Sequence, residues 1–139
     1  MGLIALAKRG APVAGALLLL TLAACAEAPK AQLANPASVN CGKLGGILKI
    51  ETKPGGEIGV CYFEDNRQCE EWALYRGQCR VGGVKVTGYA TRAARYCAIT
   101  GGKYTFTAPG TDSTSEQGAC TLPSGKLCDV HAYYEGHCR

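Results

Sequence analysis

Eight of the nine cysteines fall into two sets of four with nearly the same spacing, and this constrains the fold more than any other feature. Successive cysteines are 20, 8 and 10 residues apart in the first set and 23, 8 and 10 apart in the second. Two identical consecutive intervals are hard to obtain by chance, so the spacing indicates a duplicated module. The two sets are Cys41, Cys61, Cys69 and Cys79, then Cys97, Cys120, Cys128 and Cys138.

Residues between the cysteines also match when the two copies are aligned. The pair Gly45-Gly46 aligns with Gly101-Gly102, Gly59 with Gly118, and Tyr75 with Tyr134. The three extra residues of the second copy fall within 108–117, a segment rich in Gly, Ser and Thr. A longer loop costs little free energy at an exposed hairpin tip.

The length of each copy predicts the fold class. About 45 residues bury too little apolar surface to offset the entropy of ordering the backbone. Two disulfides, each contributing roughly 2–4 kcal/mol, would make up the difference. We therefore expect an α+β fold of two small disulfide-stapled modules, 35–79 and 91–139, each a β-hairpin with two short helices. Residues 80–90 would be a free linker or an added strand that docks one module on the other.

Local signals place the elements of each module. Asn35 and Pro36 are a helix cap and a first helical residue, and Gly45-Gly46 ends that helix, as Gly101-Gly102 ends 91–99. Strands are expected at 47–52 and 59–64, with the second copy's first strand at 103–107, and further helices at 68–76 and 127–135. The strand positions expected to face inward are Leu48, Ile50, Cys61 and Phe63, then Tyr104, Phe106, Cys120 and Leu122.

These elements also predict a disulfide pairing. A helix of some eight residues would separate Cys69 from Cys79 by about 12 Å, whereas bridged Cα atoms lie within about 7 Å. A two-residue turn at 65–66 would place Cys61 and Cys69 on opposite faces of the hairpin. The remaining choice pairs Cys41 with Cys69 and Cys61 with Cys79. By repetition, Cys97 would pair with Cys128 and Cys120 with Cys138.

The odd cysteine, Cys25, ends a segment with the parts of an export signal. Lys8 and Arg9 precede an apolar run over 11–22 that is short for a membrane span. The run ends in Leu22-Ala23-Ala24-Cys25, which resembles the bacterial lipobox, in which the cysteine receives a lipid before cleavage. We expect a lipoprotein signal peptide at 1–24, lipidation at Cys25, a tether at 25–34, and sorting to the outer membrane because Ala26 follows the cysteine.

Charge and motif spacing argue against several function classes. Without Lys8 and Arg9, the chain has thirteen basic and eleven acidic residues, a net charge of +2. Nucleic-acid binders usually carry a strongly basic surface, so this charge argues against that class. The cysteine spacing does not match zinc knuckles, and we expect no metal and no cofactor. Cys128 and His131, with His137 nearby, are the one conceivable nucleophilic pair. The first copy has no histidine, so we expect no enzyme and no catalytic residue.

Two further residue groups are candidate binding sites. Glu64-Asp65 and Glu70-Glu71 are the densest acidic group, and a solvated helix start explains them better than a cation site. The second group is four aromatic residues, Trp72, Tyr75, Tyr133 and Tyr134, which could form an exposed binding patch. Packing of one or two of them in the core, with the others exposed singly, explains them better.

A family resemblance rests on the first copy. Asn35-Pro36-Ala37-Ser38, Gly59-x-Cys61-x-Phe63-x-Asp65, Cys69-Glu70-Glu71-Trp72-Ala73 and Gly77-x-Cys79 resemble a family of small bacterial lipoproteins of unknown function, often labelled hemolysin. The second copy is more diverged: His131 replaces Trp72, and 123–125 replaces the 64–66 turn. The resemblance implies an envelope lipoprotein and brings no catalytic residues.

We therefore expect an outer-membrane-anchored lipoprotein of the cell envelope that acts as a non-enzymatic binding or structural module. Its partners would be the membrane, through the lipid anchor, and an envelope protein or protease. One alternative is a protease inhibitor that presents the loop 53–57 or the loop 108–117. A second alternative, a membrane-active hemolysin, rests on the family label alone, since no long cationic amphipathic helix follows the leader.

Overall fold

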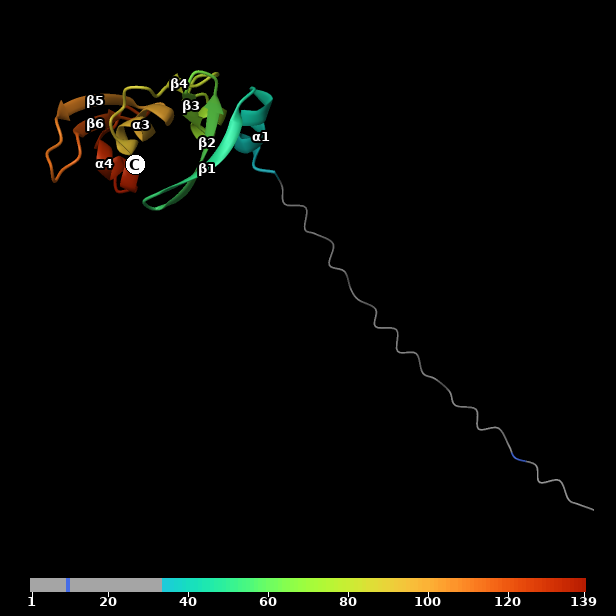
Figure 1. Cartoon of the computed structure of the whole chain (residues 1–139). Helices are drawn as coiled ribbons and strands as arrows, with labels where there is room; N and C mark the ends of the chain where they lie inside the picture. Colours follow the sequence, from blue (N-terminus) through green and yellow to red (C-terminus); the bar gives the residue numbers. More distant parts are fainter. Residues whose placement is uncertain (1–9, 11–33) are drawn as a thin grey trace, which may run out of the picture. The chain divides into compact units, whose positions relative to one another are not determined.

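The computed structural model describes residue 10 and residues 34–139 (Figure 1). The predicted signal peptide apart from Gly10, the predicted lipidation site Cys25 and the tether apart from Ala34 therefore lie outside the described residues. The described residues 34–139 lie in one compact unit. Four disulfides and three hydrophobic clusters lie inside this unit. It therefore holds what a small domain needs to fold by itself.

The first module carries a four-stranded antiparallel sheet in the order β1-β2-β3-β4. Its elements are α1 (Pro36–Lys43), β1 (Ile47–Lys53), β2 (Gly56–Phe63), β3 (Arg67–Glu70), α2 (Glu71–Tyr75) and β4 (Val84–Lys85). Strand β4 lies in the segment 80–90, for which the sequence left open a free linker or an added strand. The structure shows a strand there, and it pairs with β3.

The second module repeats this order with a three-stranded sheet, β5-β6-β7. Its elements are α3 (Arg92–Ile99), β5 (Lys103–Ala108), β6 (Gln117–Thr121), β7 (Leu127–Asp129) and α4 (Val130–Glu135). The predicted fold class, α+β with two disulfide-stapled modules, is confirmed. The extra residues of this copy lie in the loop between β5 and β6.

The first helix of each module begins and ends as its sequence predicts. The side chain of Asn35 accepts a hydrogen bond from the Ala37 amide at 3.0 Å, and Pro36 opens α1. The chain leaves the helix through Gly45, whose φ of +80° suits glycine. Thr91 caps α3 in the same way through the Ala94 amide.

The second helix of each module is shorter than predicted, because a strand occupies its first residues. Arg67–Glu70 pair with β2, placing Cys69 opposite Cys61. Glu70 then caps α2, accepting from the amides of Trp72 at 3.0 Å and Ala73 at 2.8 Å. Asp129 caps α4 in the same way. An acidic residue directly after the third cysteine of each set was therefore the true start signal.

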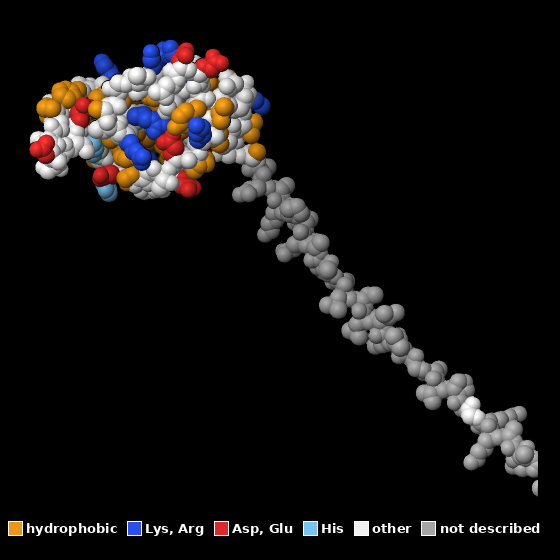
Figure 2. Space-filling view, in the orientation of Figure 1, with side chains coloured by type: hydrophobic (Ala, Val, Ile, Leu, Met, Phe, Trp, Pro, Cys, Tyr) orange, Lys and Arg blue, Asp and Glu red, His pale blue; other side chains and the backbone are white. Residues whose placement is uncertain are grey.

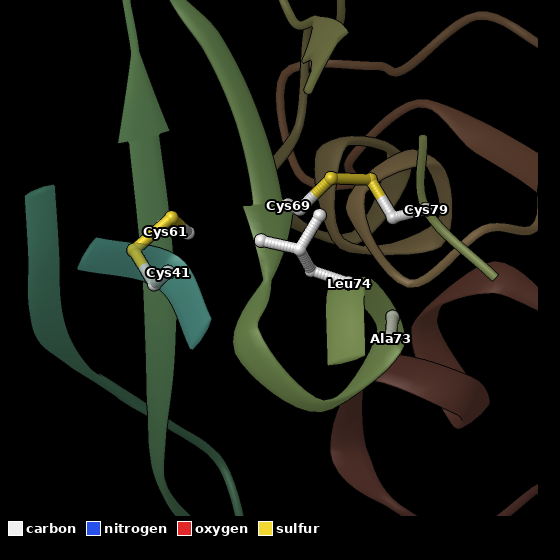
Figure 3. Packing of buried hydrophobic residues seen from close by; sticks show 6 residues of the cluster. All are labelled: Cys41, Cys61, Cys69, Ala73, Leu74 and Cys79. Carbon is white, nitrogen blue, oxygen red and sulfur yellow. A yellow bond between two sulfur atoms is a disulfide. The ribbon is translucent and has the colours of Figure 1, made fainter. Parts of the chain in front are cut away.

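The predicted disulfide pairing was wrong in both modules. The structure joins Cys41 to Cys61 and Cys69 to Cys79 in the first module, with Cα atoms 5.7 and 5.8 Å apart. It joins Cys97 to Cys120 and Cys128 to Cys138 in the second. Figure 3 shows both bridges of the first module beside Leu74 and Ala73 in one buried cluster.

Two assumptions behind the prediction were wrong, and the second, on the length of the helix, produced the error because it excluded the Cys69–Cys79 bridge. The turn after β2 has three residues, 64–66, because Phe63 pairs with Arg67, so Cys61 and Cys69 are cross-strand partners rather than on opposite faces. Helix α2 has only five residues, and the chain then folds back on it. The amides of Gln78 and Cys79 both donate to the carbonyl of Ala73, which brings Cys79 close to Cys69.

The inward strand positions were partly predicted. Cys61, Cys120 and Leu122 are buried, while Leu48, Phe63 and Tyr104 pack on the cores as partly buried side chains. Ile50 and Phe106, in contrast, are 59% and 54% exposed, so these two predictions were wrong. Ile50 pairs across the strands with Gly59. The carboxyl group of Glu71 lies directly over Gly59, so close that a Cβ at this position would be 2.4 Å from Cδ of Glu71. The inner face is polar at that position.

Candidate functional site

The second module packs against the outer face of the first module's sheet through α3, which contacts strands of both sheets (Figure 1). Val60 of β2 and Ile99 of α3 are both fully buried, and Val86, just after β4, completes this third cluster. Partly buried side chains surround them: Ile58, Tyr62, Val84, Tyr89 and Tyr96. The two modules therefore share a hydrophobic interface.

A polar network joins the same two modules beside the apolar cluster. The guanidinium of Arg95 on α3 donates two hydrogen bonds of 2.7 Å to the carboxylate of Glu51 on β1. Its Nε donates to Oε1 of Gln68 at 2.7 Å. The hydroxyl of Tyr62 also donates to Glu51. The hydrogen bonds from Arg95 lower the pKa of Glu51, and the same bonds raise that of Arg95.

Two close backbone contacts complete the docking of the modules. A Cβ on Gly101 would lie 2.2 Å from the carbonyl oxygen of Gln78, so only glycine allows this approach. At the tip of the β1–β2 hairpin, Nζ of Lys53 donates to the Tyr134 carbonyl at 2.9 Å. The same ammonium lies 5.2 Å from the ring centre of Tyr96. The first of the two loops considered for protease inhibition is thus partly held by the second module.

A cleft of about 330 Å³ opens along this interface. The first module contributes Glu70, Arg76 and Gln78 to its walls. The second module contributes Tyr96, Thr100, Leu122, Pro123, Ser124, Tyr133 and Arg139. Pockets of this size between domains are common places for ligands, and this one exists only because the modules are docked.

The chemistry of the cleft suits binding by stacking and by hydrogen bonds. The rings of Tyr96 and Tyr133 have centroids 5.1 Å apart. Burial, followed by the nearby Tyr133, raises the pKa of Tyr96 to about 12, and burial also raises that of Tyr133. Both phenols therefore stay protonated at neutral pH. Arg76 and Arg139 add positive charge, and the Glu70 carboxylate is already engaged as the cap of α2.

Of the histidines and acidic residues singled out in the sequence, only Glu70 lines this cleft. Cys128 lies on β7 in a disulfide, and His131 on α4 contacts the carbonyl of Glu116 at 2.7 Å. His137 is exposed and 3.7 Å from Glu135. Over residues 34–139, no group of three or more His, Cys, Asp or Glu side chains is placed to hold a metal.

The four aromatic side chains considered as one patch form two separate groups. Trp72 and Tyr75 stack edge to face on α2, with centroids 5.8 Å apart, and both are exposed. Tyr133 and Tyr134 instead contact Tyr96 in the second module. Only Tyr133 of the four lines the cleft between the modules.

The acidic pair Glu70-Glu71 has a structural role in both members. Glu71 is 5% exposed and accepts hydrogen bonds from Nδ2 of Asn35 at 3.1 Å and the hydroxyl of Ser38 at 2.6 Å. This network ties α1 to α2, and the second module has no equivalent because Val130 stands at the position of Glu71. The pair is therefore not a solvated helix start.

The comparison with known families agrees with the duplication. The model of the domain of unknown function DUF333 matches residues 32–78 and again 88–137. The chain belongs to the DUF333 family. It carries two DUF333 copies, and the docking surfaces described above are formed between them. No curated protein and no solved structure matches the chain.

The docking surfaces differ between the DUF333 copies at aligned positions. The buried Ile99 and the ion-paired Arg95 of α3 correspond to Lys43 and Val39 of α1. Val60 of β2 corresponds to Ala119 of β6. Each copy is therefore specialised for one side of the interface. Among residues 10 and 34–139, no helix is long and apolar enough to cross a bilayer.

Proposed function

We propose that this protein is a lipid-anchored, non-enzymatic binding module of the cell envelope, and that the cleft between its two DUF333 copies is the binding site. The proposal rests on the observation that both modules contribute walls to the cleft. The first module supplies Arg76, and the second supplies the paired rings of Tyr96 and Tyr133. Both walls present groups that bind ligands without bond-making chemistry.

The anchoring part of the proposal rests on Leu22-Ala23-Ala24-Cys25 after a basic and apolar leader. Acylated Cys25 would become the mature N-terminus, attached to the outer membrane, and residues 26–33 would then link the lipid to the folded unit. Cys25→Ala, or globomycin treatment, should leave unprocessed precursor and abolish acyl labelling of the membrane fraction. Normal processing and labelling of Cys25→Ala would contradict the anchor.

The binding part can be tested in intact cells with a photoreactive amino acid placed on each wall of the cleft. Replacing Arg76 and, separately, Ser124 should give the same cross-linked envelope component, because both residues line the cleft. Lys103, exposed and outside the cleft, is the matched control and should give no such product. Adducts from Lys103 identical to those from the cleft positions, or none from either wall, would contradict the proposal.

A protease-inhibitor role is the second candidate, and one loop supports it. The segment between β5 and β6 is exposed over most of its length. It is braced at its base by His131, which contacts the Glu116 carbonyl, and at its tip by a bridge between Thr111 and Thr114. An exposed loop on a disulfide-stapled scaffold loses little entropy on binding. Inhibition of an envelope protease by residues 32–139, abolished when this loop is shortened, would favour this candidate over the cleft.

A further inference from the structure

A second concave surface lies on the interface, between β1 and α3, and has a different character from the cleft. This groove of about 420 Å³ is lined by Lys49, Glu51, Thr52, Tyr62, Arg92 and Arg95, among others. Figure 2 shows basic side chains gathered around acidic ones in the region between α3 and the β1–β2 hairpin. Three cationic side chains thus face one carboxylate.

The single carboxylate of the groove, that of Glu51, is already hydrogen-bonded within the protein. Both oxygens of Glu51 accept hydrogen bonds from Arg95, and Tyr62 donates to one of them. Arg95 has a second fixed partner in Gln68. This leaves the positive charges of Lys49 and Arg92, neither of which forms a salt bridge within the described residues 34–139.

The two free cations come from different modules and line the same groove. Nζ of Lys49 lies 4.6 Å from the ring centre of Tyr62, at the wall of the groove. Arg92 is close enough to Glu51 for its charge to help lower the pKa of that carboxyl, after the larger effect of Arg95. The segment 80–96 that leads into α3 carries four basic residues and no acidic one. Positive charge is therefore concentrated at the module boundary.

We infer that this groove binds a phosphate group. Two uncompensated positive charges match the charge of a phosphate monoester. An arginine fork and a lysine ammonium are the side chains that recognise phosphate oxygens. The phosphate could belong to an anionic lipid headgroup or to a soluble compound, and the site is the same for both. The inference concerns a surface separate from the cleft, so it can fail while the cleft proposal stands.

The test uses residues 32–139 and titration with inorganic phosphate, followed by nuclear magnetic resonance. The groove variant is Lys49→Ala with Arg92→Ala, which leaves the Arg95–Glu51 pair intact. The control, Lys85→Ala with Lys103→Ala, removes the same charge from exposed positions outside the groove. We expect saturable shifts around Tyr62 in the wild type and the control. In the groove variant, affinity should fall about tenfold or more, as the loss of two charge-assisted contacts implies.

Vesicles separate the two sources of the phosphate. Sedimentation with phosphatidic acid vesicles, whose headgroup is a phosphate monoester, but not with phosphatidylcholine vesicles, that is lost only in the groove variant would identify a lipid headgroup. Binding of inorganic phosphate without vesicle binding would identify a soluble compound. The inference is overturned if the groove variant and the control bind both probes equally, or if the wild type binds neither inorganic phosphate nor the anionic vesicles. Unchanged melting of both variants would exclude misfolding as the cause of a loss.

Discussion

The guanidinium of Arg95 in the second module donates two parallel hydrogen bonds of 2.7 Å to the carboxylate of Glu51 in the first, and both side chains are largely shielded from water. The paired geometry fixes the rotation of α3 on the sheet, because a guanidinium and a carboxylate bind in this way only when they are coplanar. Beside it, Val60 and Ile99 supply the apolar part of the contact. Together these contacts make the duplicated modules a single folded unit.

Removing Arg95 should destabilise that unit. Arg95→Ala leaves Glu51 and Gln68 without their partner in a shielded position, and we expect a loss of about 1–3 kcal/mol in the free energy of unfolding. Urea denaturation with the disulfides intact would measure it. Arg92→Ala, one turn earlier on α3 and without a salt bridge, should change stability by less than about 0.5 kcal/mol. Equal losses in the two variants would contradict the role assigned to Arg95.

Acid should weaken the same contact. The pKa of Glu51 is lowered in the folded state from its ordinary value of 4.5, mainly by Arg95. Its stabilising contribution is therefore fully present above pH 4.5 and is lost as the pH falls through the folded-state pKa. Glu51→Gln should lose less stability than the wild type between pH 7 and pH 3. The same acid sensitivity in both proteins would show that Glu51 does not contribute.

The disulfide pairing can be checked by trypsin digestion of the unreduced, denatured protein. Cleavage separates the four cysteines of the first module, because a basic residue lies between each pair. We expect 31–43 joined to 50–67, and 68–76 joined to 77–80. The second module should release 127–139 with an internal disulfide and no attached peptide. A product that joins 31–43 to 68–76 would support the rejected pairing.

The sequence predicted those parts of the fold that depend on neighbouring residues. Asn35 and Pro36 cap α1 through contacts within a few positions, and the repeat spacing predicted the duplication. The strand Arg67–Glu70 was missed because long-range pairing with β2 overrides a helix-like local pattern. The pairing errors followed directly from that strand, since Cys69 was placed on a helix.

Docking of the modules was considered only through a strand at 80–90, and the residues of α3 that form the interface were missed, although the sequence held a signal for them. Aligned positions of a simple tandem repeat should be similar, yet Arg95 and Ile99 stand where the first copy has Val39 and Lys43. Such differences mark surfaces that only one copy uses. The cleft could not be predicted in the same way, because Arg76 and Tyr133 are distant in sequence and meet only after docking.

The central claim is that the two copies dock as one unit, and two glycines in equivalent positions test it most directly. Gly45 and Gly101 end the first helix of their modules with φ of +80° and +84°. Alanine at either position should cost about 1–2 kcal/mol through backbone strain. At Gly45 the added Cβ meets nothing within 4 Å, whereas at Gly101 it meets the Gln78 carbonyl at 2.2 Å.

The decisive measurement is therefore the free energy of unfolding of Gly101→Ala compared with Gly45→Ala, both in residues 32–139 with the disulfides intact. The docked arrangement predicts that Gly101→Ala loses about 1–3 kcal/mol more than Gly45→Ala, because the clash forces the modules apart. Hydrogen exchange at the amides of Val60 and Ile99 should rise in Gly101→Ala alone. Equal destabilisation, with unchanged exchange at these amides, would contradict the docking of the two modules.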